Sequence, residues 1–193
     1  MSIENRVVFL SGRLVNLRPV QKSDIPLLTK WINDPNVRQY LASTFPQTEK
    51  QEEAWYENLG KDNKNIVLTI ETKDGKPIGV MGIHKIEWQR GFGTTGAFIG
   101  ESEYWGNGYG TDAKMILLDH AFNTLGLRKI YSDVIAFNKR SLRYSLRCGY
   151  KIEGRLRKHI FRKGKYWDEI VIGVFRDEWL PIWKKYKKTG KVR

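Results

Sequence analysis

The run Tyr104-Trp-Gly-Asn-Gly-Tyr-Gly-Thr111 is the feature that most restricts how this chain can fold. It follows a short β-strand expected over 94–100 and opens the longest amphipathic helix, expected over 111–125. Glycines at three alternate positions let the backbone adopt positive φ angles and approach a ligand closely. The unpaired N–H groups at a helix start, with the positive end of the helix dipole, attract anions. The sequence therefore predicts a strand–loop–helix unit whose backbone holds a pyrophosphate.

Two observations limit the chemistry of the glycine runs. No Lys-Ser or Lys-Thr pair follows the loop, so it lacks the pattern of a P-loop that hydrolyses nucleoside triphosphates. A glycine-rich turn that merely joins strand to helix is the structural alternative. An earlier run, Gly91-Phe-Gly93-Thr-Thr-Gly96, matches G-x-G-x-x-G but leads into a strand instead of a helix. We therefore interpret it as a hairpin connection and not as a dinucleotide site.

The rest of the chain alternates between strand and helix patterns. Asp74-Gly75 and Lys163-Gly164 mark two hairpins, which argue against a purely parallel, doubly wound sheet. We expect an α/β fold with a mixed sheet. The strand patterns cover 13–19, 65–72, 78–87, 94–100, 129–136, 150–161 and 166–175, and the helix patterns cover 23–31 with Ser23 as N-cap, 48–59, 111–125, 140–148 and 178–187.

Length and charge suggest one domain with a basic end. A chain of 193 residues with 40% hydrophobic residues can bury one sizeable core. The net charge is +13, and the last ten residues hold six basic side chains and no acidic one. We expect a single domain over 1–183 and a basic C-terminal tail over 184–193. Such charge suits a polyanionic partner, such as nucleic acid or a phosphate-rich cofactor, or simply a solubilising surface.

Several classes of protein are disfavoured by composition. Cys148 is the only cysteine, so an internal disulfide and a Cys-rich zinc site are excluded. No apolar run approaches the roughly 20 residues that span a bilayer. The first ten residues do not resemble a signal peptide. We expect a cytoplasmic protein with no membrane contact.

The ordered set of motifs resembles the GNAT superfamily of N-acetyltransferases. The strand, Trp105-Gly-Asn-Gly-Tyr-Gly110 and the following helix look like its acetyl-CoA pyrophosphate loop, with Trp105 where Gln or Arg is usual. Asn138-Lys-Arg-Ser141 followed by Gly149-Tyr150 resembles the second family signature. The resemblance covers roughly residues 11–180 and is strongest to the branch of ribosomal-protein N-terminal and spermidine acetyltransferases. It implies a mostly antiparallel sheet with a splayed central strand pair, flanked by helices.

This resemblance implies direct transfer of acetyl from the CoA thioester to a primary amine in a ternary complex, without a metal. The acceptor would be a protein N-terminus, a polyamine or an amino sugar. Asn138 would bond the pantetheine arm, and it can also serve as a helix N-cap. The residues implied to bind acetyl-CoA are Phe98, Ile99, Gly100, Trp105, Gly106, Asn107, Gly108, Tyr109, Gly110, Thr111, Asn138 and Ser141.

The family's usual catalytic groups are replaced in this chain. Ser145 stands where a tyrosine acid is usual, and the adjacent Tyr144 is the alternative acid. A helix turns about 100° per residue, so Ser145 should share a face with Asn138 while Tyr144 points toward sheet or solvent. No acid occurs on the strand 94–100, which leaves Glu87 and His84 as nearest bases. Strand alternation would point them oppositely, and we prefer Glu87, with a surface carboxylate or a water chain as alternatives.

The acceptor, the oligomeric state and a rival function stay open. Acidic residues near 49–53, with Asp34, could attract a polyamine, and aromatic residues in the first two helices could line an acceptor pocket or form core. Core is preferred for Trp31 and Trp55. The rival is a non-catalytic GNAT-fold CoA-binding protein that contacts RNA or a ribosomal partner through its basic surface. The tail over 184–193 could make such a contact, and a homodimer is left open.

Overall fold

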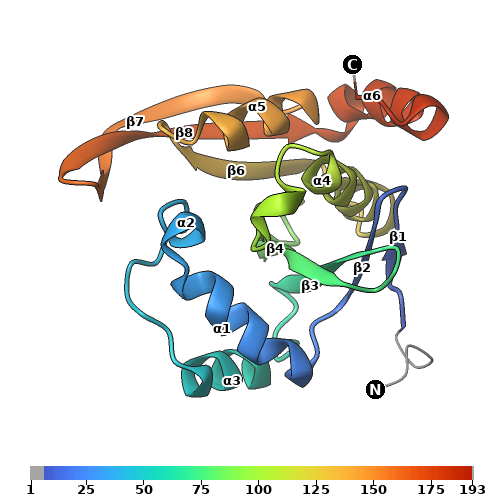
Figure 1. Ribbon diagram of the computed structural model, residues 1–193. Helices are drawn as coiled ribbons and strands as arrows, with labels where there is room; N and C mark the ends of the chain where they lie inside the picture. Colours follow the sequence, from blue (N-terminus) through green and yellow to red (C-terminus); the bar gives the residue numbers. More distant parts are fainter. Residues whose placement is uncertain (1–6, 193) are drawn as a thin grey trace. The chain divides into compact units, whose positions relative to one another are not determined.

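The computed structural model describes residues 7–192 of the chain (Figure 1). Besides strands and α-helices, it contains two short 3₁₀ turns, Lys22–Asp24 and Ser102–Tyr104, and a π-helical turn, His120–Thr124. The strands are β1 (Leu10–Ser11), β2 (Val15–Pro19), β3 (Ile66–Thr72), β4 (Pro77–Glu87), β5 (Phe92–Ile99), β6 (Lys129–Ile135), β7 (Lys151–Arg162) and β8 (Lys165–Phe175). The α-helices are α1 (Ile25–Asn33), α2 (Pro35–Arg38), α3 (Glu49–Asn58), α4 (Tyr109–Asp119), α5 (Lys139–Arg147) and α6 (Arg176–Thr189).

Within residues 7–192, eight strands form one sheet in the order β1-β2-β3-β4-β5-β6-β8-β7. The ladders β1/β2, β2/β3, β3/β4, β6/β8 and β7/β8 are antiparallel, and β5/β6 is parallel. The mixed, mostly antiparallel sheet expected from the sequence is confirmed.

The pairing of β5 with β6 is short. The parallel ladder joins Phe92–Thr94 to Lys129–Tyr131. Strand β5 continues to Ile99, and β6 continues to Ile135 along its ladder with β8. The last residues of β5 therefore lie beyond the β5/β6 ladder. The splayed central strand pair that the family resemblance implies requires such a short ladder.

The chain divides into two compact units. The first takes the chain up to Lys85 and resumes over Gly96–Ile116. The second takes Ile86–Thr95 and the chain from Leu117 onward. The glycine loop and the last residues of β5 thus belong to the first unit, and α5 and the β7–β8 hairpin belong to the second.

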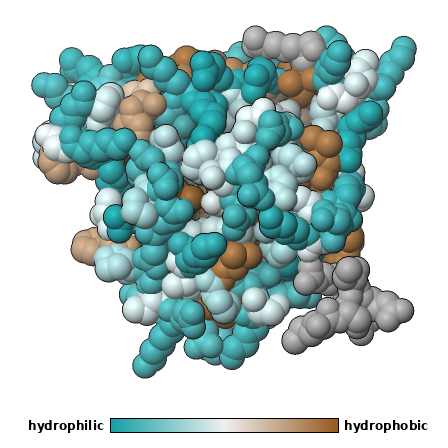
Figure 2. All heavy atoms as spheres, in the orientation of Figure 1, coloured by the Kyte–Doolittle hydropathy of each residue, from teal (hydrophilic) through white to brown (hydrophobic). Residues whose placement is uncertain are grey.

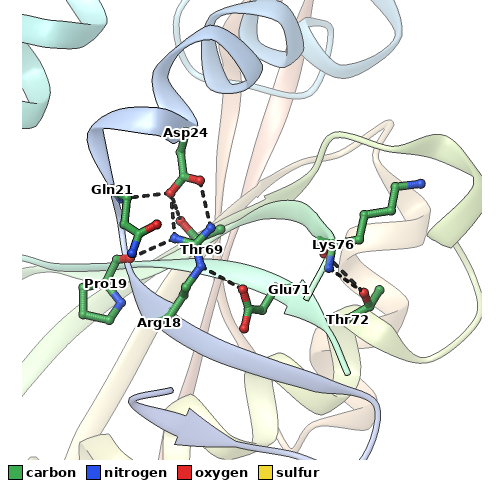
Figure 3. A network of polar contacts seen from close by, with 8 residues as sticks. All are labelled: Arg18, Pro19, Gln21, Asp24, Thr69, Glu71, Thr72 and Lys76. Atoms are coloured by element: carbon green, nitrogen blue, oxygen red, sulfur yellow. Dashed lines mark hydrogen bonds and ion pairs between the residues drawn. The ribbon is translucent and has the colours of Figure 1, made fainter. Parts of the chain in front are cut away.

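Buried ion pairs fix the start of α1 against β2 and β3 (Figure 3). The Arg18 guanidinium donates two 2.8 Å hydrogen bonds to the Asp24 carboxylate and one of 2.8 Å to Glu71. Asp24 also accepts hydrogen bonds from the Gln21 N–H, at 2.9 Å, and from the Thr69 hydroxyl, at 3.0 Å. Burial alone would raise the pKa of Asp24, but these hydrogen bonds, that from Arg18 first, hold the pKa below its usual value.

This network also corrects the predicted start of the first helix. Ser23 lies inside the 3₁₀ turn Lys22–Asp24, and Asp24 is the N-cap of α1. The prediction was wrong because the ion pair with Arg18, a tertiary contact, holds the chain at Asp24. Further on, Asp34 is the N-cap of α2, and its carboxylate accepts a hydrogen bond from the Asn36 N–H at 2.8 Å.

The core of the first unit joins α1 to the sheet. Trp31 is 2% exposed, which confirms its predicted place in the core. Its indole covers Gly100, where a Cβ would come within 2.1 Å of the indole Cγ, so only glycine fits there. The other members of this cluster are Val20, Leu28 and Val80, with partly buried Leu27, Trp55, Tyr56, Leu59, Val67 and Phe98 packed against them.

The G-x-G-x-x-G run lies mostly in a strand. Gly91, with φ of 66°, ends the connection between β4 and β5, and its carbonyl accepts the Arg128 N–H at 2.7 Å. Strand β5 already begins at Phe92. The connection thus ends at Gly91, and the strand that the sequence predicts from Thr94 begins two residues earlier, at Phe92.

Helix α6 is longer than predicted and takes in most of the expected basic tail. It runs over Arg176–Thr189 and ends at Gly190, whose φ is 72°. Trp183 and Tyr186 are buried, and Trp183 stacks on Trp179 with ring centroids 5.2 Å apart. The basic side chains over 184–189 are thus carried by a helix with a buried aromatic face.

Hydrophilic residues cover most of the face in view in Figure 2, and the hydrophobic ones form small separate patches. Among residues 7–192, no helix combines the length and the apolar character needed to cross a bilayer. The same residues contain no group of three or more His, Cys, Asp or Glu side chains arranged to hold a metal ion.

Candidate functional site

The glycine loop adopts the predicted left-handed conformation at two of its three glycines. Gly106 and Gly108 have φ angles of 84° and 92°, in the left-handed region that other residues rarely adopt. Gly110 has no positive φ and already belongs to α4. A Cβ at Gly106 would meet nothing within 4 Å, and one at Gly110 would lie an ordinary 3.6 Å from Ile99 Cδ1. The loop therefore has open space beside it at Gly106.

The start of α4 offers backbone donors. The first intrahelical hydrogen bond runs from the Asp112 N–H to the Gly108 carbonyl at 2.9 Å. The N–H groups of Tyr109–Thr111 precede it, in the turn where a helix has no acceptors of its own. Together with the helix dipole they form the arrangement that binds phosphate groups. These are residues that the resemblance assigned to the cofactor.

Side chains brace the loop. The Trp105 indole N–H donates to the Ile99 carbonyl at 2.8 Å, which ties the loop to the last residue of β5. The Asn107 amide donates to the Glu103 carbonyl at 3.0 Å. Tryptophan in place of the usual Gln or Arg thus has a structural use, and the Ile99 carbonyl is already engaged.

Asp112 is a residue that sequence reasoning missed. It is fully buried, and its Oδ2 accepts hydrogen bonds from the backbone N–H of Leu14, at 2.7 Å, and of Val15, at 3.0 Å. The Leu14 side chain in turn lies 3.3 Å from where a Cβ on Gly108 would be. The segment between β1 and β2 therefore packs on the glycine loop. The available sequence signal was an acidic residue in the first turn of the helix, and its burial is seen only in the structure.

The end of β5 lies close to β4. A Cβ at Gly79 would come within 2.3 Å of the Phe98 carbonyl oxygen, so glycine is required there. The Gly100 N–H donates to the Ile78 carbonyl at 2.8 Å. Of the backbone groups expected to contact the cofactor at 98–100, the Gly100 N–H and the Ile99 carbonyl are thus used within the protein.

His84 lies beside this part of β5. The half-buried imidazole borders Gly82 and Gly96, since a Cβ at Gly96 would lie 3.4 Å from its Cδ2 and Nε2. Burial, and then the positive charge of Lys85, lower the His84 pKa. The ring is therefore neutral near pH 7 and can accept a proton. Lys85 has a φ of 51°, which interrupts the regular alternation on which the comparison with Glu87 relied.

Glu87 belongs to the second unit, at the end of β4. Its side chain is exposed, and its carbonyl accepts the Gly91 N–H at 2.8 Å in the turn toward β5. The preference for Glu87 as base stays a prediction.

Helix α5 begins as predicted. The Asn138 Oδ1 accepts a hydrogen bond from the Ser141 N–H at 3.1 Å, which confirms Asn138 as the N-cap. Both side chains are half-buried. Their contact with the pantetheine arm stays a prediction.

The two candidate acids lie together in the second unit. The side chains of Tyr144 and Ser145 share a hydrogen bond, and burial raises the pKa of the Tyr144 phenol. Ser145 is 1% exposed. Nearby, the Tyr150 and Thr95 hydroxyl groups lie 2.9 Å apart. Tyr144 is half-buried, and its phenol lies beside Ser145.

Glu52 of α3 is a second residue that the sequence did not single out individually. It is 6% exposed, and burial raises the pKa of its carboxyl group. Within residues 7–192 the structure records no hydrogen bond or ion pair of that carboxylate. Trp55 and Tyr56 follow it at helical spacings of three and four, on the side that packs on the core of the first unit.

Known proteins share this fold and sequence pattern. The model of the acetyltransferase (GNAT) domain family matches residues 14–151. The SPbeta prophage-derived uncharacterized N-acetyltransferase YokL of Bacillus subtilis is 29% identical over 173 residues, which cover 89% of this chain and 96% of that protein.

Two solved structures, each under 25% identical, share the fold. Spermidine N-acetyltransferase from Vibrio cholerae, in complex with CoA and spermine, has a TM-score of 0.81 and 23% identity, covering 86% of this chain and 98% of that one. Mycobacterium smegmatis RimJ in complex with CoA-disulfide has a TM-score of 0.82 and 20% identity, covering 94% of each chain.

Proposed function

Because the chain belongs to the acetyltransferase (GNAT) family, we propose that it transfers the acetyl group of acetyl-CoA directly to a primary amine of an aliphatic polyamine. The observation that carries the proposal is the loop before α4. Two left-handed glycines lead into the first turn of the helix, whose N–H groups have no acceptor within the helix, and the space beside Gly106 is open. Such an arrangement suits the pyrophosphate of CoA, which needs no charged side chain when a helix start binds it.

The base comes first in the reaction. The acceptor must lose a proton before its nitrogen attacks the thioester carbonyl. We assign this proton to the His84 imidazole, which is neutral near pH 7 and borders the strand that would carry the thioester. Glu87, the base preferred from sequence, is the alternative.

The leaving group needs the second proton. When the carbon–sulfur bond breaks, the electron pair stays on sulfur and the CoA thiolate takes up one proton. The nitrogen, positively charged after its attack, loses one proton as the amide forms, which balances the proton taken up by the thiolate. We assign the proton donor to the hydrogen-bonded pair of Ser145 and Tyr144. The raised pKa of Tyr144 keeps the phenol protonated, and Ser145 would relay or orient the proton.

Glu52 supports a cationic acceptor. A buried carboxylate on the same helix face as two aromatic rings can hold an ammonium group by charge and by cation–π contact. A polyamine carries a second ammonium group besides the one that reacts. The V. cholerae structure named above is of a spermidine N-acetyltransferase with spermine bound, which agrees with this class of acceptor.

An acceptor panel tests the proposal. Thiol release from acetyl-CoA is measured with spermidine, with a peptide bearing a free N-terminus and with an amino sugar. We expect the highest kcat/KM with spermidine. Glu52→Gln should raise KM for spermidine at least about tenfold, as expected for a lost charged contact. Glu53→Gln, at a half-buried neighbour whose carboxylate pairs with Lys22 at 3.6 Å, should not. A preference for the peptide, or equal effects of both variants, would contradict the polyamine assignment.

A further inference from the structure

The net positive charge of the chain belongs to one of its two units. The segments of the second unit, 86–95 and 117–193, hold 21 of the 34 Lys and Arg residues and 8 of the 21 Asp and Glu residues. The first unit holds the remaining 13 of each and is neutral. The net charge of +13 therefore belongs to the second unit, although the predicted pyrophosphate loop lies in the first.

Much of this charge lies on the hairpin of β7 and β8, the long pair of strands drawn in orange in Figure 1. Residues 155–166, here called the basic hairpin, include six Lys and Arg side chains and no acidic one. Five of the six are exposed. They are Arg155, Arg157, Lys158, Lys163 and Lys165, with Arg162 half-buried.

Two aromatic rings are exposed among these charges. Phe161 and Tyr166 are directly paired across the strands, and their ring centroids lie 5.0 Å apart. They are 55% and 63% exposed. Large aromatic side chains left this open, between cationic side chains, are the composition of surfaces on which nucleic-acid bases stack.

The hairpin is poorly suited to pairing with a second copy of itself. Strand β7 ends the sheet order, so its outer edge is a place where another strand could add. Register shifts interrupt β7 at 152–154 and 156–160, and Lys158 has a φ of 49°. Bulges and lysines of this kind protect sheet edges from strand addition, and two such hairpins would also repel each other.

We propose that the basic hairpin binds single-stranded nucleic acid. Arg157 and Lys158 contact phosphate groups, and Phe161 and Tyr166 stack on bases. The charge supplies affinity that depends on salt, and the rings supply a contribution that does not. The proposal uses none of the residues assigned to acetyl transfer, and it leaves either RNA or DNA as the ligand.

Fluorescence anisotropy with labelled oligo(U) and oligo(dT), each of about 15 nucleotides, tests the proposal. Arg157→Glu with Lys158→Glu should weaken binding at least about tenfold and reduce the slope of log K against log salt by about 1.4, or 0.7 for each lost phosphate contact. Phe161→Ala with Tyr166→Ala should weaken binding about tenfold with the slope unchanged. Lys61→Glu with Lys64→Glu, an equal charge change on exposed residues of the neutral unit, should stay within about twofold. The two oligonucleotides distinguish RNA from DNA.

Four results would overturn the proposal. They are absence of oligonucleotide binding, equal weakening by the Lys61 and Lys64 control, equally tight binding of poly-aspartate to the hairpin, and a change of oligomeric state by light scattering in the aromatic variant. The last two would assign the surface to an acidic protein and to a second copy of the chain. Circular dichroism confirms that each variant folds. Because no acetyl transfer is measured, failure here leaves the proposed function untouched.

Discussion

The Asp112 carboxylate holds the Leu14 backbone N–H at 2.7 Å although the two residues are 98 positions apart in the chain. The same oxygen accepts the Val15 N–H, and Asp112 is fully buried. Leu14 in turn borders Gly108 of the glycine loop. The segment before β2 is thus attached to the first turn of α4 and supports the loop from one side.

Replacing Asp112 should loosen this support. Asp112→Ala leaves the buried Val15 N–H and the partly buried Leu14 N–H without an acceptor. An unpaired buried N–H group costs about 1–3 kcal/mol. We expect a loss of about 2–4 kcal/mol in urea unfolding, with a raised KM for acetyl-CoA. Asp119→Ala, in the same helix, removes only an exposed hydrogen bond to Asn123 and should cost less than about 1 kcal/mol. Similar losses in both variants would show that the Leu14 contact is not special.

A substitution at Gly110 tests whether an added methyl group crowds the ligand, without straining the backbone. Its φ is not positive and an added Cβ would make an ordinary contact, so Gly110→Ala should fold and gain about 0.5–1 kcal/mol of helix stability. The same methyl group would stand in the helix turn that we assign to the pyrophosphate, so CoA affinity by calorimetry should fall. Unchanged affinity in this stable variant would remove the pyrophosphate from the loop.

Gly108→Ala is the matched comparison in the same loop. It should lose both stability and affinity, because its φ of 92° strains any other residue. Affinity lost with stability intact would mean that the loop tolerates the strain.

The base can be identified from the pH dependence of kcat/KM. The His84 pKa lies below its usual value of 6.5, so the imidazole is neutral above that pH and becomes protonated only as the pH falls below it. We expect kcat/KM to decline on this acid side in the parent protein and His84→Gln to lower the plateau about 10²–10⁴-fold. Loss of the plateau in Glu87→Gln, with His84→Gln active, would return the role to Glu87.

The sequence could predict those features that are determined by residues close together in the chain. The left-handed glycines at 106 and 108 and the Asn138 cap are set by neighbours a few residues away, and they were predictable. The Asp112 contact with Leu14 joins distant segments and left no periodic trace. The left-handed backbone of Lys85 altered the strand alternation that was used to compare His84 with Glu87. A lysine in a strand pattern does not predict such a conformation.

The ion pairs of Arg18 make the free energy of unfolding depend on pH. Asp24 has a lowered pKa in the folded protein, so its contribution is present above its ordinary value of 3.8 and is lost as the pH falls through the folded pKa. Arg18→Met should destabilise the protein by about 3–5 kcal/mol at pH 7, because two buried carboxylates lose their cation. The variant should also lose less stability on acidification than the parent. Parallel pH curves of unfolding free energy would contradict this account.

The proton donor is tested by the pair Tyr144 and Ser145. If the phenol supplies the proton through the serine hydroxyl, Tyr144→Phe and Ser145→Ala interrupt the same path. Each should lower kcat about 10²–10⁴-fold, as for a lost general acid, and the double variant should be little worse than either. CoA affinity should change little. If Ser145→Ala lowers kcat only a fewfold while Tyr144→Phe is inactive, the tyrosine donates the proton directly. Two small, additive effects would move the proton source to solvent.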